Sequence, residues 1–314
     1  MKAILTGITG NLGHEVANDL TRRGFELVPV VRPGKKLDSH NFSEIIYNDL
    51  LSTDKINPFS TANCIVHCAG IVHFKNAGNA NQQIMLKMID LAQRLKIPLY
   101  FVSTAFVYKP DGRYNHFNNS YEQDKWQSEQ LLLESNIPFG IFRPSILVGN
   151  SKTGKIQNFS GYYFVVEAFL SAIQHSAQAG LKLRFPKLLG KTNMVSTDQV
   201  AECIGKSLEN GRQEILFITN PEPPTFDWLL SETLGYFGLL DQVDFIDCSF
   251  EEFGTLGLTD IEKRLYRLGT HFNPYWSISY GFPNTICKES LINQTYLAKI
   301  LDYFRKSPAH AQGH

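Results

Sequence analysis

The chain has 314 residues, of which 43% are hydrophobic and 19% charged, enough to bury a sizeable core in one large domain or two closely associated ones. Its 30 basic and 30 acidic residues give a formal net charge of zero. This balance shows no electrostatic signature of a nucleic-acid-binding protein, so we expect no nucleic-acid partner.

Targeting and metal-binding signals are also missing from the sequence. A predicted strand begins two residues after Met1, so we expect no signal peptide. The most apolar run, Tyr162 to Ile173, is short and interrupted by Glu167, so we expect no membrane span. The five cysteines form no CxxC pair and the nine histidines no HExxH motif. These patterns favour a cytoplasmic protein with buried thiols and no metal site.

The chain opens with a predicted strand, a glycine turn and a helix. The apolar run from Ala3 to Leu5 leads into Thr6-Gly7-x-x-Gly10-x-x-Gly13, and HEVANDLTRRG follows with a helical pattern. Glycines allow a tight turn and let main-chain N–H groups approach a pyrophosphate at the helix N-terminus. A glycine turn that merely ends a strand is the alternative. The expected cofactor contacts are Gly7, Thr9, Gly10, Asn11, Leu12 and Gly13.

The second predicted strand, Phe25 to Arg32, ends in a cation. In dinucleotide-binding folds an acid at this position binds the free ribose 2′-hydroxyl, whereas a cation accommodates a 2′-phosphate. Arg32 occupies the position here, with Lys35 and Lys36 close behind and no acid before Asp38. We therefore expect NADP(H) as the cofactor, bound in part by Arg32 and Lys36. A solvated basic turn is the alternative.

Two more strands and a helix follow. The run 43–50 predicts a third strand that places Asp49 and Leu50 near the adenine, although an ordinary strand-end Asp fits nearly as well. The apolar run 63–70 predicts a strand buried on both faces. Its small last residues let the backbone approach the cofactor, so Cys68, Ala69 and Gly70 are expected there. Residues 79–95 have helical apolar spacing, and the repeated alternation predicts an α/β fold with a doubly wound parallel sheet.

The next two predicted elements carry side chains with hydroxyl and amine groups. The predicted strand 98–108 places Ser103, Thr104 and Ala105 at its carboxyl end, where open α/β sheets carry their sites. The predicted helix 118–135 carries Tyr121 and Lys125, which lie four residues apart on one face. The alternative is a structural role, in which the strand-end hydroxyls bond the backbone and the Tyr–Lys pair lies on the surface. The order in which these motifs follow the glycine turn favours a catalytic role over this alternative.

On these motifs the chain resembles the extended short-chain dehydrogenase/reductase family. A further segment, FRPSILVGNSKTGKI at 142–156, is similar to the Arg-Pro-Ser…Gly-x-Ser-x-Thr-Gly run of one branch. That branch contains fatty acyl-CoA reductases and the thioester reductase domains of carboxylic acid reductases and peptide synthetases. Lys125-Trp126 with Ser128-Glu129 is also typical of it. The resemblance covers nearly the whole chain and is strongest through residue 156.

The resemblance assigns roles to the strand-end and helix residues. Tyr121 would be the general acid, and a neighbouring Lys125 ammonium would lower the pKa of its phenol and hold the nicotinamide ribose. Thr104 would hydrogen-bond the substrate carbonyl, with Ser103 as the alternative. Pro144 would lie beside the nicotinamide, and the adjacent Ser145 is also an expected cofactor contact.

The second half of the chain carries weaker signals. We predict a helix at 161–177, a helix at 193–211 and a strand at 214–220. The expected dinucleotide-binding domain covers 1–156 and is completed by about 191–220, while 157–190 and 221–314 form a substrate lobe. Lys152, Lys155 and Lys191 are candidates for a CoA or phosphopantetheine phosphate, with solvated surface as the alternative.

The sequence thus predicts an NADP-dependent reductase of an acyl thioester, or of a related aldehyde or ketone. Its substrate would be a small molecule or a CoA- or carrier-protein-linked acyl group, and the protein a monomer or homodimer. Only about sixteen residues separate Thr104 from Tyr121, so a compact reductase of the dihydroflavonol type stays open. An NAD-dependent nucleotide-sugar epimerase or dehydratase also stays open, as does a non-catalytic NADP-binding regulator.

Overall fold

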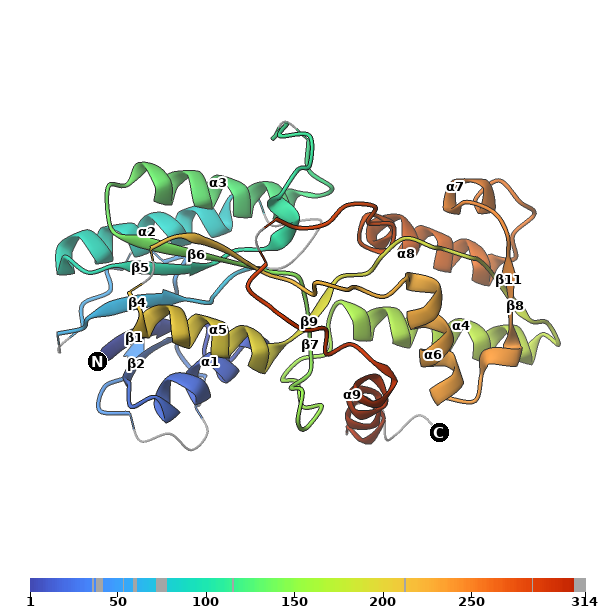
Figure 1. Cartoon of the computed structure of the whole chain (residues 1–314), viewed down its shortest axis with the longest axis horizontal. Helices are drawn as coiled ribbons and strands as arrows, with labels where there is room; N and C mark the ends of the chain where they lie inside the picture. The colour runs from blue at the N-terminus through green and yellow to red at the C-terminus, as the bar shows by residue number, and fades with distance from the viewer. Residues whose placement is uncertain are drawn as a thin grey trace. The chain divides into compact units, whose positions relative to one another are not determined.

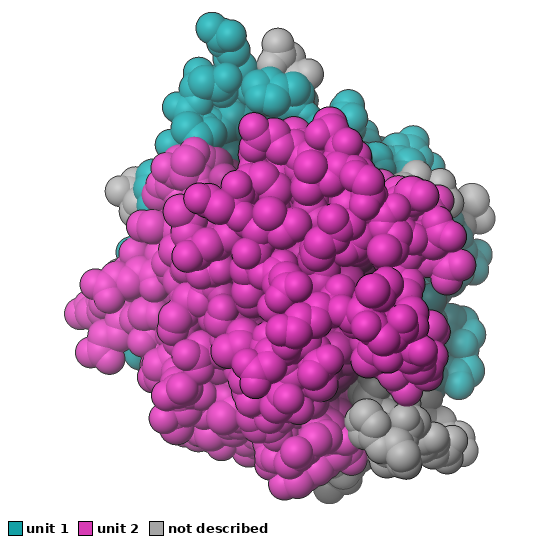
Figure 2. All heavy atoms as spheres, turned by 90° about the vertical axis from the view of Figure 1, so that its right-hand side faces the viewer, with its two compact units in different colours: residues 1–147, 195–219, 282–287 teal, residues 148–194, 220–281, 288–314 magenta. Residues whose placement is uncertain are grey.

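The computed structural model describes residues 1–35, 37, 42–52, 54–58, 61–71, 78–114, 116–211, 213–283 and 285–307. The chain forms two compact units, which Figure 2 colours separately. Unit 1 contains residues 1–147, 195–219 and 282–287, and unit 2 contains 148–194, 220–281 and 288–314. Each unit is therefore assembled from separate stretches of the chain.

The described residues of unit 1 form a seven-stranded parallel sheet in the order β10-β6-β5-β4-β1-β2-β3 (Figure 1). Chain order reverses between β1 and β4, and such a switch point is where open α/β sheets bind ligands. The predicted doubly wound fold is confirmed. The strands are β1 (Lys2–Thr6), β2 (Glu26–Val31), β3 (Ile46–Tyr47), β4 (Cys64–His67), β5 (Leu99–Val102), β6 (Phe139–Pro144) and β10 (Ile215–Ile218).

Helices cover both faces of this sheet (Figure 1). On one face α1 (Asn11–Arg22) packs against α5 (Thr197–Glu209), and on the other α2 (Ala80–Leu95) packs against α3 (Ser120–Glu134). Side chains of a strand alternate between the two faces, so in β1 Ala3 and Leu5 join the core beneath α1 and α5, while Ile4 joins the core beneath α2 and α3. Burial on both faces explains why the strands read as continuous apolar runs.

Three element boundaries differ from those predicted. The strand expected over 98–108 ends at Val102, and the chain then turns into the 3-10 helix η1 (Ala105–Val107). The hydroxyl of Thr104 accepts a hydrogen bond from the backbone N–H of Phe106, which supports this turn. The strand expected over 43–50 keeps only the two residues of β3. The helix expected over 193–211 is preceded by β9 (Met194–Ser196), and its helical part is α5.

A late segment of the chain returns to unit 1. The backbone N–H of Ile286 donates to the carbonyl oxygen of Phe217 at 3.0 Å, and the Thr285 hydroxyl donates to the carbonyl oxygen of Thr219 at 2.9 Å. The ring of Phe282 stacks on Phe217 with centroids 6.1 Å apart. Since β10 is an edge strand with free backbone groups, the returning segment satisfies part of that edge.

Unit 2 combines helices with a small parallel sheet of β8 and β11. Its core is aromatic: the Phe169 and Phe185 rings meet edge to face at 4.8 Å, and Phe226 stacks on Trp276 at 4.4 Å. No helix among the described residues is long and apolar enough to cross a membrane. The strand β7 (Ile146–Val148) spans the position in the chain where unit 1 ends and unit 2 begins. The elements of unit 2 are α4 (Tyr162–Gln178), β8 (Leu183–Pro186), α6 (Phe226–Tyr236), η2 (Leu240–Gln242), β11 (Val243–Ile246), α7 (Phe250–Phe253), α8 (Asp260–Trp276) and α9 (Gln294–Lys306).

Candidate active site

The glycine turn after β1 packs too tightly for side chains at two of its positions. Gly7 has φ +78°, and a Cβ there would lie 2.6 Å from the backbone nitrogen of Ala69. A Cβ at Gly13 would overlap the carbonyl oxygen of Gly7. Gly10 is the N-cap of α1, and a glycine has no side chain with which to cap the helix. The turn therefore has the shape and the donors of an anion cradle.

The carboxyl ends of β1 and β4 are hydrogen-bonded to each other. The Thr6 hydroxyl accepts from the backbone N–H of Ala69 at 3.2 Å and lies 2.7 Å from Nδ1 of His67. Burial lowers the pKa of His67 to about 3, helped by the charge of Lys125, so the imidazole is neutral. Burial raises the pKa of the Cys68 thiol to about 12. The ordered strand ends hold Ala69 and Gly70 beside the glycine turn.

The residues predicted to contact the adenosine half of the cofactor occupy varied environments. Arg32 is exposed at the end of β2, and no hydrogen bond or ion pair of its guanidinium is found within the part of the chain that the structure describes. Lys36 lies outside the described residues. Asp49 is exposed, and its carboxylate accepts from the backbone N–H of Leu51 at 3.1 Å. Of the remaining turn residues, Thr9 is exposed, Asn11 and Leu50 are half-buried, and Leu12 belongs to the core.

Lys125 is buried at the carboxyl end of β5. Its Nζ donates to the carbonyl oxygen of Val102 at 2.9 Å and lies 4.6 Å from the centroid of the Phe101 ring. Burial lowers the pKa of Lys125 to about 8, and the carboxylate of Asp124 opposes that shift. A Cβ at Gly70 would lie 3.0 Å from Nζ. The ammonium is thus placed directly beside the strand end expected to approach the cofactor.

Tyr121 lies on the first turn of α3, four residues before Lys125, and is partly exposed. Burial raises the pKa of Tyr121, and the carboxylates of Glu122 and Asp124 raise it further. The net shift is opposite to the one expected from a neighbouring Lys125 ammonium. A raised pKa keeps the phenol protonated and makes it a weaker acid than a free tyrosine.

Two buried hydroxyls end adjacent strands. Ser103 directly follows β5 and Ser145 directly follows β6, and neither Oγ has a hydrogen-bond partner among the described residues. Thr104 is also buried, and its Oγ1 accepts a long hydrogen bond from Phe106 while keeping its own proton to donate. Pro144, the last residue of β6, is buried beside them. Because β5 and β6 are parallel neighbours, these groups lie at one edge of the sheet.

An acid that the sequence did not single out connects the helices at this edge. Asp124, which is 1% exposed, accepts hydrogen bonds from the backbone N–H groups of Asn81 at 2.9 Å and Gln82 at 3.2 Å, and so caps α2. The Asn81 amide in turn bonds both the N–H and the carbonyl of Ile71, just after Gly70. A residue between Tyr121 and Lys125 is therefore linked through Asn81 to Ile71, just beyond the end of β4.

A buried ion pair ties α3 to β6. Arg143 donates from Nε and Nη2 to the two carboxylate oxygens of Glu129 at 3.1 and 2.5 Å, and its guanidinium lies 5.1 Å from the Phe217 ring. Glu129 lies one turn after Lys125, and Arg143 precedes Pro144. The available sequence signal was the polar inner face of α3, where Glu122, Asp124, Lys125, Ser128 and Glu129 are all buried.

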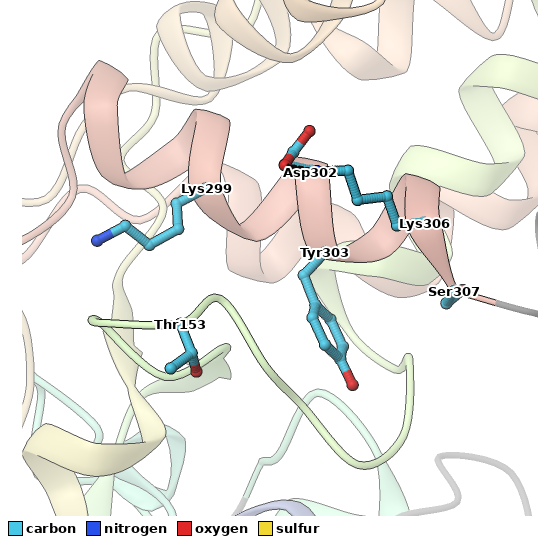
Figure 3. Close-up of a pocket in the computed structure, with 6 residues that line it drawn as sticks. All are labelled: Thr153, Lys299, Asp302, Tyr303, Lys306 and Ser307. Carbon is cyan, nitrogen blue, oxygen red and sulfur yellow. Dashed lines mark hydrogen bonds and ion pairs between the residues drawn. The ribbon is translucent and has the colours of Figure 1, made fainter.

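A separate hollow lies in unit 2 (Figure 3). It has a volume of about 320 Å³ and contains no predicted site residue. Its two ammonium groups have partners, because Lys299 donates to the carbonyl oxygen of Ser151 at 2.7 Å and Lys306 pairs with Asp302 at 2.6 Å. Across the described residues, no group of three or more His, Cys, Asp or Glu side chains is arranged to hold a metal ion. The hollow is lined by Thr153, Lys299, Asp302, Tyr303, Lys306 and Ser307.

The CoA-phosphate candidates Lys152, Lys155 and Lys191 belong to the same unit and are all exposed. The backbone of Lys191 pairs with Ile278 and Thr225, which holds this residue on an ordered segment. Their predicted contact with a phosphate stays a prediction.

The sequence matches one family model and one curated relative. Residues 49–204 match the NAD-binding family model described as male sterility protein. A curated relative, the hybrid PKS-NRPS synthetase gkaA of Penicillium citrinum, is 32% identical over a stretch that covers 46% of this chain. That stretch is only 4% of the synthetase, so the likeness concerns one part of a much longer protein.

Solved structures share the fold. The terminal R domain of the myxalamid PKS-NRPS pathway aligns with a TM-score of 0.68 and 19% identity, over 97% of this chain and 90% of that one. A thiolation-reductase di-domain from an archaeal non-ribosomal peptide synthetase gives 0.66 and 18%, over 98% and 91%. The UDP-glucose 4-epimerase of Thermus thermophilus, solved with NAD, gives 0.61 and 18%, over 98% and 100%.

Proposed function

Because this chain belongs to the extended short-chain dehydrogenase/reductase family, whose fold binds a nicotinamide cofactor, we propose that it is an NADP-dependent reductase of an acyl thioester. The observation that carries the proposal is the placement of Lys125. Its ammonium is buried at the carboxyl end of β5 beside Gly70, on the helix that also carries Tyr121. An amine and a phenol are therefore carried by one helix at the carboxyl edge of the sheet, where open α/β folds bind their ligands.

The residues present fit a dinucleotide. The glycine turn, in which a Cβ at Gly7 would meet Ala69 and one at Gly13 would meet Gly7, would bring main-chain N–H groups to a pyrophosphate at the N-terminus of α1. The exposed guanidinium of Arg32 supports NADP(H) over NAD(H), since it would pair with a 2′-phosphate. We assign the cofactor contacts to the glycine turn, Arg32, Ala69-Gly70, Lys125 and the strand end at Pro144-Ser145.

The reaction divides between cofactor and protein. The reduced nicotinamide, when bound, supplies a hydride to the carbonyl carbon. The Tyr121 hydroxyl donates its proton to the carbonyl oxygen, and the Thr104 hydroxyl donates a hydrogen bond to that oxygen as negative charge develops on it. Lys125 holds the ribose hydroxyls and adds positive charge near the phenolate that Tyr121 leaves. With a thioester, the hemithioacetal that forms loses its thiol to give an aldehyde.

The likeness to the thiolation-reductase di-domain and to the terminal R domain of the myxalamid pathway supports a thioester substrate, because a thiolation domain carries its acyl group as a thioester. We therefore propose an acyl group linked to a carrier protein or to CoA. The epimerase likeness is the basis of a second candidate, an NAD-recycling nucleotide-sugar enzyme. Arg32 disfavours that candidate, since an acid at this position is what holds a free 2′-hydroxyl.

The deciding experiment measures NADPH and NADH oxidation with acyl-CoAs, acyl-phosphopantetheine thioesters, aldehydes, ketones and UDP-sugars. We expect thioester-dependent NADPH oxidation with release of free thiol and formation of an aldehyde or alcohol. Tyr121→Phe should lower kcat about 100-fold or more, the usual size of a lost general acid, while NADPH still binds. Tyr114→Phe is the matched control, because it removes a phenol hydroxyl from the loop before α3 and should leave kcat unchanged.

Two results would overturn the proposal. Undiminished turnover by Tyr121→Phe would remove the assigned proton donor. Conversion of UDP-sugars with tightly held NAD, and no consumption of NADPH with any thioester, would establish the epimerase candidate instead.

A further inference from the structure

A second buried ion pair in unit 1 has no part in the mechanism described above. Nζ of Lys109 lies 3.2 Å from Oε2 of Glu122, and the two side chains are 8% and 0% exposed. The same carboxylate accepts hydrogen bonds from both the backbone N–H and the side-chain amide of Asn118, each at 3.0 Å. Lys109 also lies 5.0 Å from the centroid of the Phe117 ring. Charges this deeply buried are retained only when their partners are well placed.

The position of the pair in the chain suggests its use. Lys109 comes five residues after Thr104, at the end of the turn that η1 forms, and η1 packs against α3. Glu122 directly follows Tyr121 on the first turn of α3. The ion pair thus joins the two segments that carry the hydroxyls assigned to the substrate carbonyl. The two residues directly before α3 contribute further contacts, because Asn118 bonds Glu122 and the Asn119 side chain caps α3.

Two aromatic rings of the preceding segment pack against Trp126 of α3. The Tyr114 ring stacks on Trp126 with centroids 5.6 Å apart, and Phe117 lies 5.7 Å from the same indole. Trp126 follows Lys125 in the helix. The segment before α3 therefore contacts the helix at Glu122 and at Trp126, and Glu122 is the nearer of the two to Tyr121 in sequence.

We propose that Lys109 and Glu122 are positioning residues that fix the spacing between Thr104 and Tyr121, so that both hydroxyls reach one carbonyl oxygen. The inference rests on the proposed function, because it assumes that the two hydroxyls share a substrate atom. Reactions of oriented groups are sensitive to displacements of about 1 Å, which can cost about 100-fold in rate. A contact that sets this spacing affects kcat without touching substrate or cofactor.

The test uses the double variant Lys109→Met/Glu122→Gln. It removes both charges at nearly constant volume and leaves no unpaired buried charge, so the protein is expected to fold. We expect kcat for the thioester to fall about 10-fold or more, with the NADPH dissociation constant and the substrate KM nearly unchanged. Amide hydrogen exchange of the peptide covering 118–125 should be faster than in the wild type.

The matched control is Arg184→Met/Glu262→Gln in unit 2. Glu262 is also buried, pairs with Arg184 at 2.7 Å and accepts from the backbone N–H of Thr259 at the start of α8. This variant should lower thermal stability to a similar degree but leave kcat and exchange at 118–125 as in the wild type. It separates a loss of general stability from a loss of positioning.

The outcomes distinguish this inference from the proposed function. Wild-type kcat in the Lys109→Met/Glu122→Gln variant would overturn the inference even if exchange is faster, because the pair would then be structural only. Unchanged exchange at 118–125 would overturn it whatever the kinetics. If the wild-type enzyme reduces no thioester or other carbonyl, the proposed function fails. Exchange at 118–125 then decides whether the pair orders the start of α3.

Discussion

Lys125 donates a hydrogen bond of 2.9 Å from Nζ to the backbone carbonyl oxygen of Val102, the last residue of β5. The bond fixes an ammonium at a strand end, with the Phe101 ring on its other side. The resulting burial has a measurable consequence.

Nucleotide affinity should decrease as the pH rises through about 8. Burial lowers the pKa of Lys125 to about 8, so its positive charge is present below this pH and is lost above it. Because we assign Lys125 to the nicotinamide ribose, the NADPH dissociation constant should rise across this interval. The measurement is a fluorescence titration of NADPH at a series of pH values. Lys125→Met should show a weak, flat profile, and an identical rise in that variant would contradict the assignment.

Charge reversal at Arg32 should discriminate between the two nicotinamide cofactors. Arg32→Glu removes a partner for the 2′-phosphate and places an anion there. A charge-assisted hydrogen bond contributes about 1.5–3 kcal/mol, so NADPH affinity should fall about tenfold or more. NADH affinity should change little. Both dissociation constants are measured by calorimetry, with the exposed Lys187→Glu of unit 2 as control. Equal losses for the two cofactors would contradict the preference for NADP(H).

Gly13→Ala should disrupt the cradle after β1. The new methyl group would overlap the carbonyl oxygen of Gly7, so the turn must shift and its N–H groups lose their alignment. We expect a lower melting temperature and loss of the stabilisation that NADPH confers in thermal unfolding. Gly235→Ala is the control. Gly235 lies in α6 with open space at its Cβ position, so this substitution should be neutral or stabilise by up to about 1 kcal/mol. A normal NADPH shift in Gly13→Ala would count against a cofactor at this turn.

Removing one partner of the Arg143–Glu129 ion pair should destabilise the protein more than removing both partners. Glu129→Gln leaves the Arg143 guanidinium buried without its carboxylate, and the free energy of unfolding should fall by about 3–5 kcal/mol. Arg143→Met/Glu129→Gln removes both charges and should recover most of that loss. Denaturant unfolding of the two variants measures the difference. A double variant less stable than the single one would show that the net attraction of the pair exceeds its cost of burial.

Several features of the site could be predicted from the residues alone because they depend on local backbone geometry. The spacing of Gly7 and Gly13 matches a turn in which a Cβ would collide with neighbouring backbone. Helical periodicity places Tyr121 and Lys125 on one face of α3. Continuous apolar runs indicate strands buried on both faces, and with the helices between them they indicate a parallel sheet.

Tertiary structure decided which polar groups meet. Asp124 caps α2 from α3, Lys109 reaches Glu122, and the segment around Thr285 returns to the edge of β10. The direction of the Tyr121 pKa shift was also decided there, by burial and by two carboxylates on its own helix. The periodicity of apolar residues predicts whether an element is a helix or a strand and which of its faces is buried. Which charged residues of different elements pair depends on how those elements pack. The spacing of these residues in the sequence does not predict that pairing.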